Sequence, residues 1–469
     1  MIWNLEKYKL LAKICNKILG DNKNDIYFLS NDIFYILREH KVVLSKYEPI
    51  FKKNFYLKHI FIFIKLFISS FLKIFIYLLV KKKQHHFNQK NYLFISHILN
   101  KDHEKILPEN DFYFSHITKN LKNETYNICK IAHYKKKNTF FLNQHLGFYN
   151  ELRIFFYLIC NTCSLLNIFF KSKEIESKVI FLAIACNFSQ SHFQNIRIYN
   201  NMKFLIEKIK PKKVITTFEG HPYERMIFSS VSDKSSDIKK IGFQHSILFK
   251  NQNTISLDLA NQNNPDIILT AGTAGKSFFI KNKINEKIIV DVIGSNRYQK
   301  KEEINNRNIH TRNILFIPEG HHEENLIFIK AAKDILKLNK DIQIIFRFHP
   351  ILYHNAVTIL QREIADLSRV KISKEIDPNI DFRKCGSFLY RGSTLAVQAA
   401  RFGLLPIYYD CENEININPF YEYPKCYKTV KSTKDLNIII EKNNYSNNDN
   451  HFTDVYFSNI QHETLNKYF

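Results

Sequence analysis

The chain is poor in glycine, proline and closely spaced cysteine, and each shortage excludes a class of protein. Only 11 of its 469 residues are glycine and 11 are proline, which excludes collagen-like, elastic and linker-dominated proteins. Its eight cysteines are too sparse for the disulfide framework of a small secreted protein. Residues 1–17 mix charges into their apolar positions and lack a small-residue cleavage site, so we expect a cytoplasmic protein without a signal peptide.

Aromatic residues and chain length indicate a folded, multidomain protein. The 41 Phe and 25 Tyr exclude a disordered chain, and the length predicts two or three domains with cores of their own. One Cys-x-x-Cys pair, Cys160 and Cys163, stands in an apolar run, and no second pair follows at metal-ligand spacing. We therefore interpret these two as buried core thiols and predict no metal site.

The charge balance predicts a polyanionic neighbour. There are 68 Lys and Arg against 44 Asp and Glu, a formal net charge of +24. Nucleic acid, an anionic membrane face or phosphorylated substrates would all fit. Lysines are densest over residues 41–90, around an apolar segment, and no common nucleic-acid-binding motif occurs. This favours a membrane surface over nucleic acid, although a basic binding protein without catalysis remains the alternative from another class.

The apolar segment at 60–80 predicts a membrane-associated helix. It reads IFIFIKLFISSFLKIFIYLLV and is followed by Lys81–Lys83. Lys65, Ser69 and Lys73 recur at a spacing of four and so form one stripe on a helix. A spanning helix would carry Lys73 into the bilayer at a cost of roughly 2.5–3.5 kcal/mol. We therefore expect a helix lying in the membrane interface; a spanning helix and one buried in the protein core are the alternatives.

Beyond residue 91, short apolar runs alternate with helical stretches, which predicts an α/β protein with parallel sheets. We expect a GT-B-like architecture in which two Rossmann-like domains face a cleft. The chain is predicted to consist of a basic N-terminal region 1–90, a first domain 91–298, a linker 299–311, a second domain 312–435 and a tail 436–469. Whether the tail crosses back to the first domain is left open. The predicted strands are Tyr92–Ile98, Tyr126–Ala132, Val179–Ala185, Val214–Phe218, Ile241–Phe243, Ile267–Thr270, Ile288–Ile293, Ile314–Ile317, Ile342–Phe348, Phe388–Tyr390 and Leu405–Tyr409; the predicted helices are Ser191–Ile209, Glu323–Leu338, Ala356–Leu367 and Leu395–Phe402.

Two loops repeat the tripeptide Glu-Gly-His after an apolar strand and before a helix, at 219–221 and 319–321. Ligands of doubly wound folds bind at the carboxyl ends of strands, so one such loop per domain predicts a shared site. Glu219 is followed by Gly220, which permits close approach of a substrate. A helix-capping role for Glu219 is the alternative.

Two further motifs in the second domain suggest anion binding. His349 follows the strand of IQIIFRFHP, and Ser393 and Thr394 begin the helix of the RGSTLAVQAARFG run. Imidazole and hydroxyl groups at a helix start can bind a phosphate. A structural histidine and an ordinary capping serine are the alternatives.

In this order, the three motifs resemble those of bacterial sialyltransferases and Kdo-transferase-like enzymes of capsule, lipopolysaccharide and O-antigen synthesis, which have the GT-B fold. DFYFSHI (111–117), GFQHS (242–246) and IGSNRY (293–298) add to the resemblance, which covers roughly 91–435. It implies that Glu219 is the general base and that His349 is catalytic at the leaving phosphate. It also implies that Ser393 and Thr394 hold this phosphate together with His349. Beyond the resemblance, we predict donor-site roles for Arg347, Glu319, Gly320 and His321, and acceptor-side or secondary roles for His221, Glu224, Gln244 and His245.

The predicted activity is inverting, metal-independent glycosyl transfer onto a bacterial surface polysaccharide or lipid-linked glycan. The absence of any Asp-x-Asp disfavours a metal-dependent GT-A transferase. The resemblance implies no cofactor beyond a nucleotide-sugar co-substrate, a CMP-linked sialic-acid- or Kdo-type sugar, and a place on the inner face of the bacterial inner membrane. Here the acidic motif has one acid where sialyltransferases commonly have two, so a UDP-sugar, a GDP-sugar or a CDP-polyol remains the alternative donor.

Overall fold

The protein is described from a computed structural model that carries side chains but no ligands. Lys81–Lys83, the linker 299–311 and His321, about which the sequence made predictions, lie outside the described residues. The structure describes residues 55–78, 87–98, 111–121, 126–132, 141–172, 174–250, 252–256, 259, 261–298, 312–320, 322–349, 352–364, 368–375, 377–411, 416–442 and 450–469.

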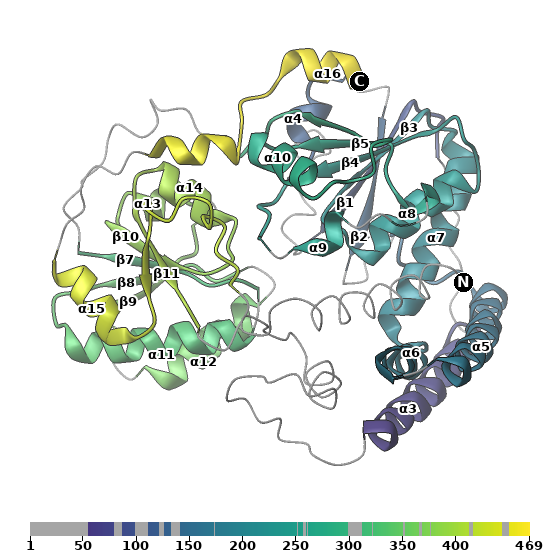
Figure 1. Cartoon of the computed structure of the whole chain (residues 1–469), viewed down its shortest axis with the longest axis horizontal. Coiled ribbons are helices and arrows are strands. Elements are labelled where there is room, and N and C mark those ends of the chain that lie inside the picture. Colours follow the sequence, from purple (N-terminus) through teal and green to yellow (C-terminus); the bar gives the residue numbers. More distant parts are fainter. Residues whose placement is uncertain are drawn as a thin grey trace.

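The first domain is built on a six-stranded parallel sheet of order β2-β1-β3-β4-β5-β6 (Figure 1). The chain passes from β1 to β2 on one side and then continues with β3 on the other side of β1. The winding therefore reverses between β1 and β3, which is where open α/β sheets form a ligand crevice. The strands are β1 (Tyr92–Ile98), β2 (Tyr126–Ala132), β3 (Lys213–Thr217), β4 (Lys239–Gln244), β5 (Ile267–Thr270) and β6 (Ile289–Val292).

Helices cover both faces of this sheet. On one face α7 (Gln190–Ile209) and α8 (Pro222–Ser232) pack onto Leu93 and Val214. On the other, Leu465 and Tyr468 of the C-terminal helix α16 (His462–Tyr468) join a core with Phe94. Figure 1 shows α16 in yellow over the first domain, so the end of the chain completes the cover of this sheet. The smaller helices of this domain are α4 (Ser115–Thr118), α9 (Asn253–Ser256), a 3₁₀ turn (Asn261–Asn263) and α10 (Thr273–Lys281).

The second domain repeats the plan with a parallel sheet of order β12-β11-β10-β7-β8-β9. Here the winding reverses between β7 and β10. Helices α11, α12 and α15 pack on one face, and α13 and α14 on the other. The elements are β7 (Ile314–Ile317), α11 (His322–Leu338), β8 (Ile344–Phe346), α12 (Tyr353–Glu363), β9 (Val370–Ile372), α13 (Asn379–Phe382), β10 (Ser387–Tyr390), α14 (Leu395–Arg401), β11 (Leu405–Tyr409), β12 (Lys428–Val430), α15 (Thr433–Glu441) and a 3₁₀ helix (Asn450–Val455).

Three long helices form a separate layer beside the first domain: α3 (Phe55–Ile76), α5 (Phe148–Lys171) and α6 (Glu174–Cys186). Phe67 of α3 lies between Phe155 and Phe188, at ring-centroid distances of 5.2 and 5.0 Å. A buried ion pair of 2.8 Å joins Glu151 of α5 to Arg197 of α7 and so ties this layer to the sheet domain.

The α/β class with two parallel sheets is confirmed, whereas three local predictions are wrong. The run Val179–Ala185 lies within helix α6, because a short apolar run between two apolar helices has no period that separates helix from strand. The predicted tail boundary at 435/436 cuts α15, whose Leu436 and Ile440 belong to the second domain's core. Cys160 and Cys163 are exposed, because the outer side of α5 is apolar as well as its inner side.

The other predicted strands are present with small changes at their ends, and the helix predicted for 356–367 instead spans Tyr353–Glu363. Strands β9 and β12, with three residues each, were not predicted.

Candidate active site

The first Glu-Gly-His loop lies at the switch point of the first sheet, directly after β3. Gly220 has a φ of 82°, and a methyl group there would lie 2.7 Å from the backbone of Ile255, so the turn requires glycine. Glu224 closes the loop by accepting backbone N–H bonds from Glu219 at 2.9 Å and from His221 at 2.8 Å. This reciprocal arrangement at the start of α8 fixes the direction in which Glu219 leaves the sheet.

A carboxylate–imidazole pair is the central feature of this loop. The Oε2 atom of Glu219 lies 2.9 Å from Nε2 of His221, and its Oε1 atom lies 3.5 Å from Nε2 of His245. Burial acts to raise the pKa of Glu219, but the two imidazoles outweigh it and hold the pKa well below its usual range. Burial also opposes the charged form of His221, yet the hydrogen bond to Glu219 and the charge of Glu224 raise its pKa above 6.5. Glu219 is therefore a weak base, whereas His221, half of whose side chain is exposed, is the basic and accessible member.

His245 and Glu224 are the two other titratable groups next to this pair. Burial lowers the pKa of His245 to about 4, so this imidazole is neutral at neutral pH. Glu224 is fully buried, and burial raises its pKa to about 7. Its carboxylate is surrounded by the loop backbone and by the Tyr223 hydroxyl at 2.9 Å. Glu224 thus holds the loop and cannot reach a bound substrate.

Other polar groups at this site were not given a role by sequence reasoning. Tyr223 hydrogen-bonds to His97, which comes from the end of β1, across the switch point. Tyr113 stacks edge-on against His245 at 4.7 Å. Arg297 donates to the carbonyl of His245 at 3.4 Å, and its charge acts on Glu219 and Tyr113. Tyr113 and Arg297 belong to motifs noted in the sequence, whereas His97 lies inside a strand with no motif around it.

The second Glu-Gly-His loop occupies the equivalent place after β7, at the switch point of the second sheet. The backbone N–H of Glu319 donates to Glu324 at 3.0 Å, and Glu324 is buried. This repeats the bond between Glu219 and Glu224 at the same spacing of five residues. The two loops are therefore alike in structure as well as in sequence.

Three predicted site residues, Glu319, Gly320 and His349, meet around this second loop. The His349 ring lies against Gly320, where an added methyl group would be 3.2 Å from its Nδ1 atom. The Glu319 carboxylate lies against Gly392, which follows β10, and a methyl group on Gly392 would be 2.7 Å from Oε2. The loops after β7, β8 and β10 thus converge, and two glycines make room for the carboxylate and the imidazole.

Ser393 and Thr394 follow Gly392 at the start of α14. Thr394 is the N-cap residue and makes no side-chain cap bond, whereas Ser393 Oγ accepts the N–H of Leu395 at 3.3 Å. Arg347 differs from them, because its guanidinium is bound to the buried carboxylate of Asp381 at 2.7 Å and to Ser373 at 3.3 Å. We assign Arg347 to this structural contact rather than to a ligand.

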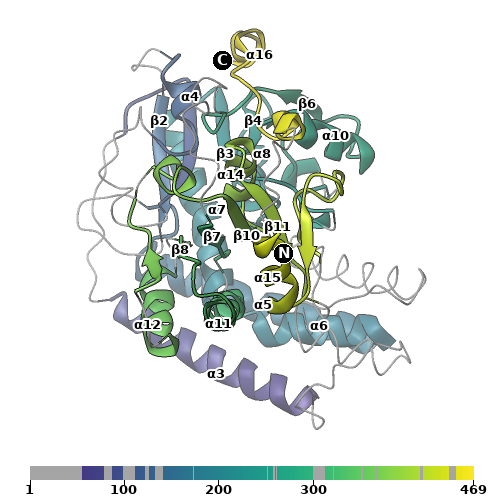
Figure 2. The ribbon, with the colours of Figure 1, turned by 90° about the vertical axis from the view of Figure 1, so that its left-hand side faces the viewer.

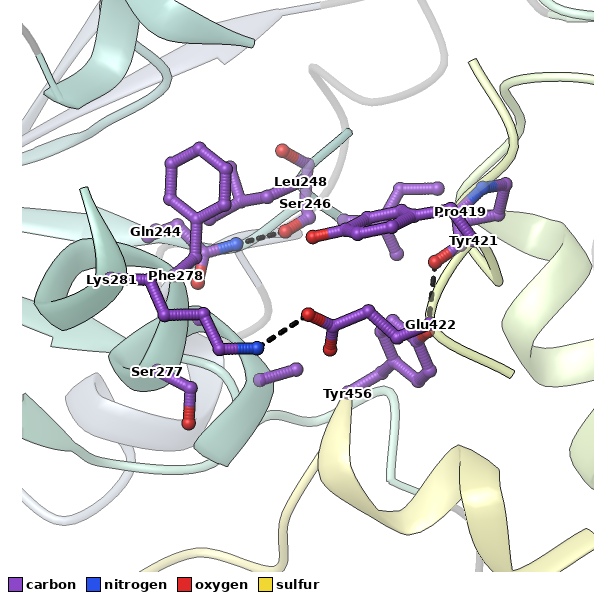
Figure 3. A pocket seen from close by; sticks show the side chains of 13 residues that line it. Gln244, Ser246, Leu248, Ser277, Phe278, Lys281, Pro419, Tyr421, Glu422 and Tyr456 are labelled. Carbon is purple, nitrogen blue, oxygen red and sulfur yellow. Dashed lines mark hydrogen bonds and ion pairs between the residues drawn. The ribbon is translucent and has the colours of Figure 1, made fainter. Parts of the chain in front are cut away.

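A pocket lies between the two domains next to the first loop (Figure 3). Gln244, the last residue of β4, and Ser246, which follows this strand, line it from the first domain, and Tyr421 and Glu422 line it from the second. Lys281 and Glu422 form an ion pair of 2.5 Å across the pocket. Ser246 also lies close enough to Glu219 to help lower the pKa of its carboxyl group, so the pocket and the carboxylate–imidazole pair adjoin. Among the described residues, no cluster of three His, Cys, Asp or Glu side chains could hold a metal ion.

Comparison with known proteins finds similarity in fold only. No family model and no curated protein matches the sequence. Among solved structures, UDP-GlcNAc 2-epimerase of Neisseria meningitidis, bound to UDP-GlcNAc, aligns at 13% identity and a TM-score of 0.48, over 80% of this chain and 97% of that one. The UDP-GlcNAc 2-epimerase of Methanocaldococcus jannaschii, in complex with UDP-GlcNAc and UDP, aligns at 14% and 0.46, over 78% and 96%. A glycotransferase of kitacinnamycin aligns at 8% and 0.42, over 81% and 95%. At these scores the assignment of function rests on the site itself.

Proposed function

We propose that this protein is a GT-B-type glycosyltransferase that moves a sugar from a nucleotide donor, held by the second domain, to an acceptor hydroxyl at the first. The observation that carries the proposal is the pair of matching Glu-Gly-His loops, one at the switch point of each sheet. Switch points at strand carboxyl ends are where doubly wound sheets bind their ligands. One loop presents a base and the other presents groups suited to a nucleotide sugar, which matches a two-substrate transfer.

At the first loop, His221 takes the proton of the acceptor hydroxyl. Its contact of 2.9 Å with Glu219 orients the ring and stabilises the imidazolium that forms. Removing the proton as the new bond forms makes the hydroxyl oxygen a better nucleophile. Glu219, expected from the sequence to be the base itself, acts here through His221.

At the second loop, His349, Ser393 and Thr394 bind the phosphate that leaves. Developing negative charge on that phosphate is stabilised by hydrogen-bond donors already in place. The Glu319 carboxylate beside Gly392 accepts hydrogen bonds from sugar or ribose hydroxyls. Loss of the nucleotide leaves an oxocarbenium-like sugar, which the acceptor attacks from the opposite face.

The donor proposed is a UDP- or GDP-linked neutral sugar. A carboxylate at Glu319 would repel the carboxylate of a sialic-acid- or Kdo-type sugar but would accept bonds from neutral hydroxyls. The alternative donor class thus fits this site better than the CMP-linked acidic sugar. The two epimerases named above hold UDP-sugars, which belong to the same class.

A donor screen tests this proposal. The full chain is incubated with UDP-, GDP- and CMP-sugars, with and without a mixture of glycan acceptors, and nucleotide release and sugar products are measured by chromatography. We expect acceptor-dependent release of UDP or GDP. Release of CMP alone would overturn the donor class, an epimerised sugar nucleotide formed without acceptor would indicate epimerisation instead of transfer, and no turnover of any donor would overturn the enzyme assignment.

The pH dependence of transfer provides a second test. A general base must be neutral to accept a proton, and the pKa of His221 is raised above 6.5. The rate should therefore rise with pH along an acid limb whose apparent pKa exceeds 6.5. In Glu219→Gln the limb should move to lower pH, because the hydrogen bond that raises the pKa of His221 is weakened. A flat profile from mildly acidic to neutral pH would instead indicate Glu219 as the direct base, since its pKa is already far lower.

A further inference from the structure

Helix α3 has two apolar sides, and the described part of the chain covers only one of them. Phe63, Phe67 and Ile74 face α5 and α6, and Ser70 Oγ donates to the carbonyl of Phe188 at 2.9 Å. Figure 2 shows α3 along the bottom edge of the molecule, with α5 and α6 next to it. On the outer side the side chains of Phe61, Ile68 and Leu72 are 64%, 51% and 60% exposed; Leu57, Ile60, Ile64, Phe71 and Phe75 are exposed as well.

The exposed apolar residues form one continuous surface. At 100° per residue, Ile60, Phe61, Ile64, Ile68, Phe71, Leu72 and Phe75 lie within a sector of about 120° on the helix. We call these seven residues the outer face of α3; Phe71 and Phe75 of this face also contact Phe155 and Phe148 of α5, at ring-centroid distances of 5.6 and 6.4 Å. A soluble protein seldom exposes a contiguous apolar surface of this kind unless it meets a partner.

The lysines of α3 indicate what kind of surface its outer face would bind. Lys65 is exposed at the edge of the outer face, about 20° from Leu72 around the helix axis, and Lys73 is exposed about 100° from Leu72. Among the described residues neither lysine has an ion-pair partner. Lysines beside an apolar stripe fit a surface that combines hydrocarbon with negative charge, which is an anionic lipid bilayer. The net charge of +24 favours the same partner.

We infer that the outer face of α3 docks the protein on anionic lipid, with the helix axis in the plane of the membrane interface. Two helices, Tyr56–Ile76 and Phe148–Lys171, have the length and composition to cross a membrane, on those criteria alone. Ser70 of α3 is bonded to Phe188, and Glu151 of α5 is paired with Arg197 of α7, so crossing by α3, alone or together with α5, would break contacts with the folded domain. Lying flat keeps those contacts and inserts only the outer face.

Vesicle co-sedimentation of the full chain tests this inference. Vesicles of phosphatidylcholine with phosphatidylglycerol are compared with phosphatidylcholine alone. Lys65→Glu with Lys73→Glu should weaken binding to anionic vesicles by at least roughly thirtyfold, because each lysine near the surface contributes to attraction. Lys330→Glu with Lys337→Glu, an equal change of charge on α11 of the second domain, should have much less effect.

Ile64→Asp with Ile68→Asp should abolish sedimentation while circular dichroism and melting temperature stay unchanged, since both side chains face outward. Ile438→Asp, on an exposed position of α15, is the matched control and should still bind. Equal binding by all variants, or no binding by the native chain, would overturn the inference. A concentration-dependent dimer that Ile64→Asp with Ile68→Asp dissociates, without vesicle binding, would assign the face to a second copy and would also overturn it. None of these outcomes depends on the proposed transfer activity.

Discussion

Glu219→Gln should lower the rate of transfer by roughly 10²–10⁴ and leave donor binding intact. Glutamine keeps the size of the side chain and can still contact His221, but it carries no charge to stabilise an imidazolium. The donor-site groups His349 and Ser393 belong to the other domain and are unaffected. The measurement is kcat under saturating substrates, together with the donor dissociation constant from calorimetry.

Three variants separate the proposed pair from its rivals. His221→Asn should cost about as much as Glu219→Gln, and the double variant little more than either, because residues acting as one unit are not additive. Glu224→Gln should mainly lower the melting temperature, since the Glu224 carboxylate is buried and holds the loop. Full activity in Glu219→Gln with a lower melting temperature would show that Glu219 only caps the helix.

The parts of the fold that are predicted well from sequence are those in which a local run of apolar residues indicates burial. Strand β5, Ile267–Thr270, is predicted to the residue because its three apolar residues and Thr270 are all buried in a strand that has a neighbour on each side. The three-residue edge strands β9 and β12 are partly exposed and carry no such run. The run in α6 is wrongly predicted as a strand because seven apolar residues do not separate helix from strand, and the packing of α6 on α3 joins segments that are far apart in sequence.

At the site, too, residues that share a local motif are predicted from sequence, whereas contacts between distant residues are not. Glu219 and Glu319 are recognisable because a carboxylate, a glycine and a histidine follow a strand within a few residues. The contact between His97 and Tyr223 joins residues 126 positions apart, so only the strand order β1-β3 brings them together. The role of Glu219 depends likewise on the His221 ring, which contacts Glu219 and stacks on Tyr223, an arrangement that no spacing in the sequence reveals.

His349→Ala should lower kcat by roughly 10²–10³, because it removes one preorganised donor to the leaving phosphate. The His349 ring lies against Gly320, so its removal leaves space in the loop rather than a clash. His354→Ala, on an exposed position of α12, removes an equal side chain from the same domain and should change nothing. The effect should be confined to transfer, with the pH limb assigned to His221 unchanged.

Ser393→Ala distinguishes phosphate binding from helix capping at the same loop. Ser393 Oγ accepts the N–H of Leu395 at 3.3 Å, a long bond whose loss should cost little stability. If Ser393 binds the phosphate, kcat should fall by a similar factor of roughly 10²–10³ while the melting temperature stays close to that of the native chain. If it only accepts the N–H of Leu395, turnover should stay near that of the native chain. Near-native turnover in both His349→Ala and Ser393→Ala would remove these residues from the donor site, and the carboxylate of Glu319 beside Gly392 would then be the group to test next.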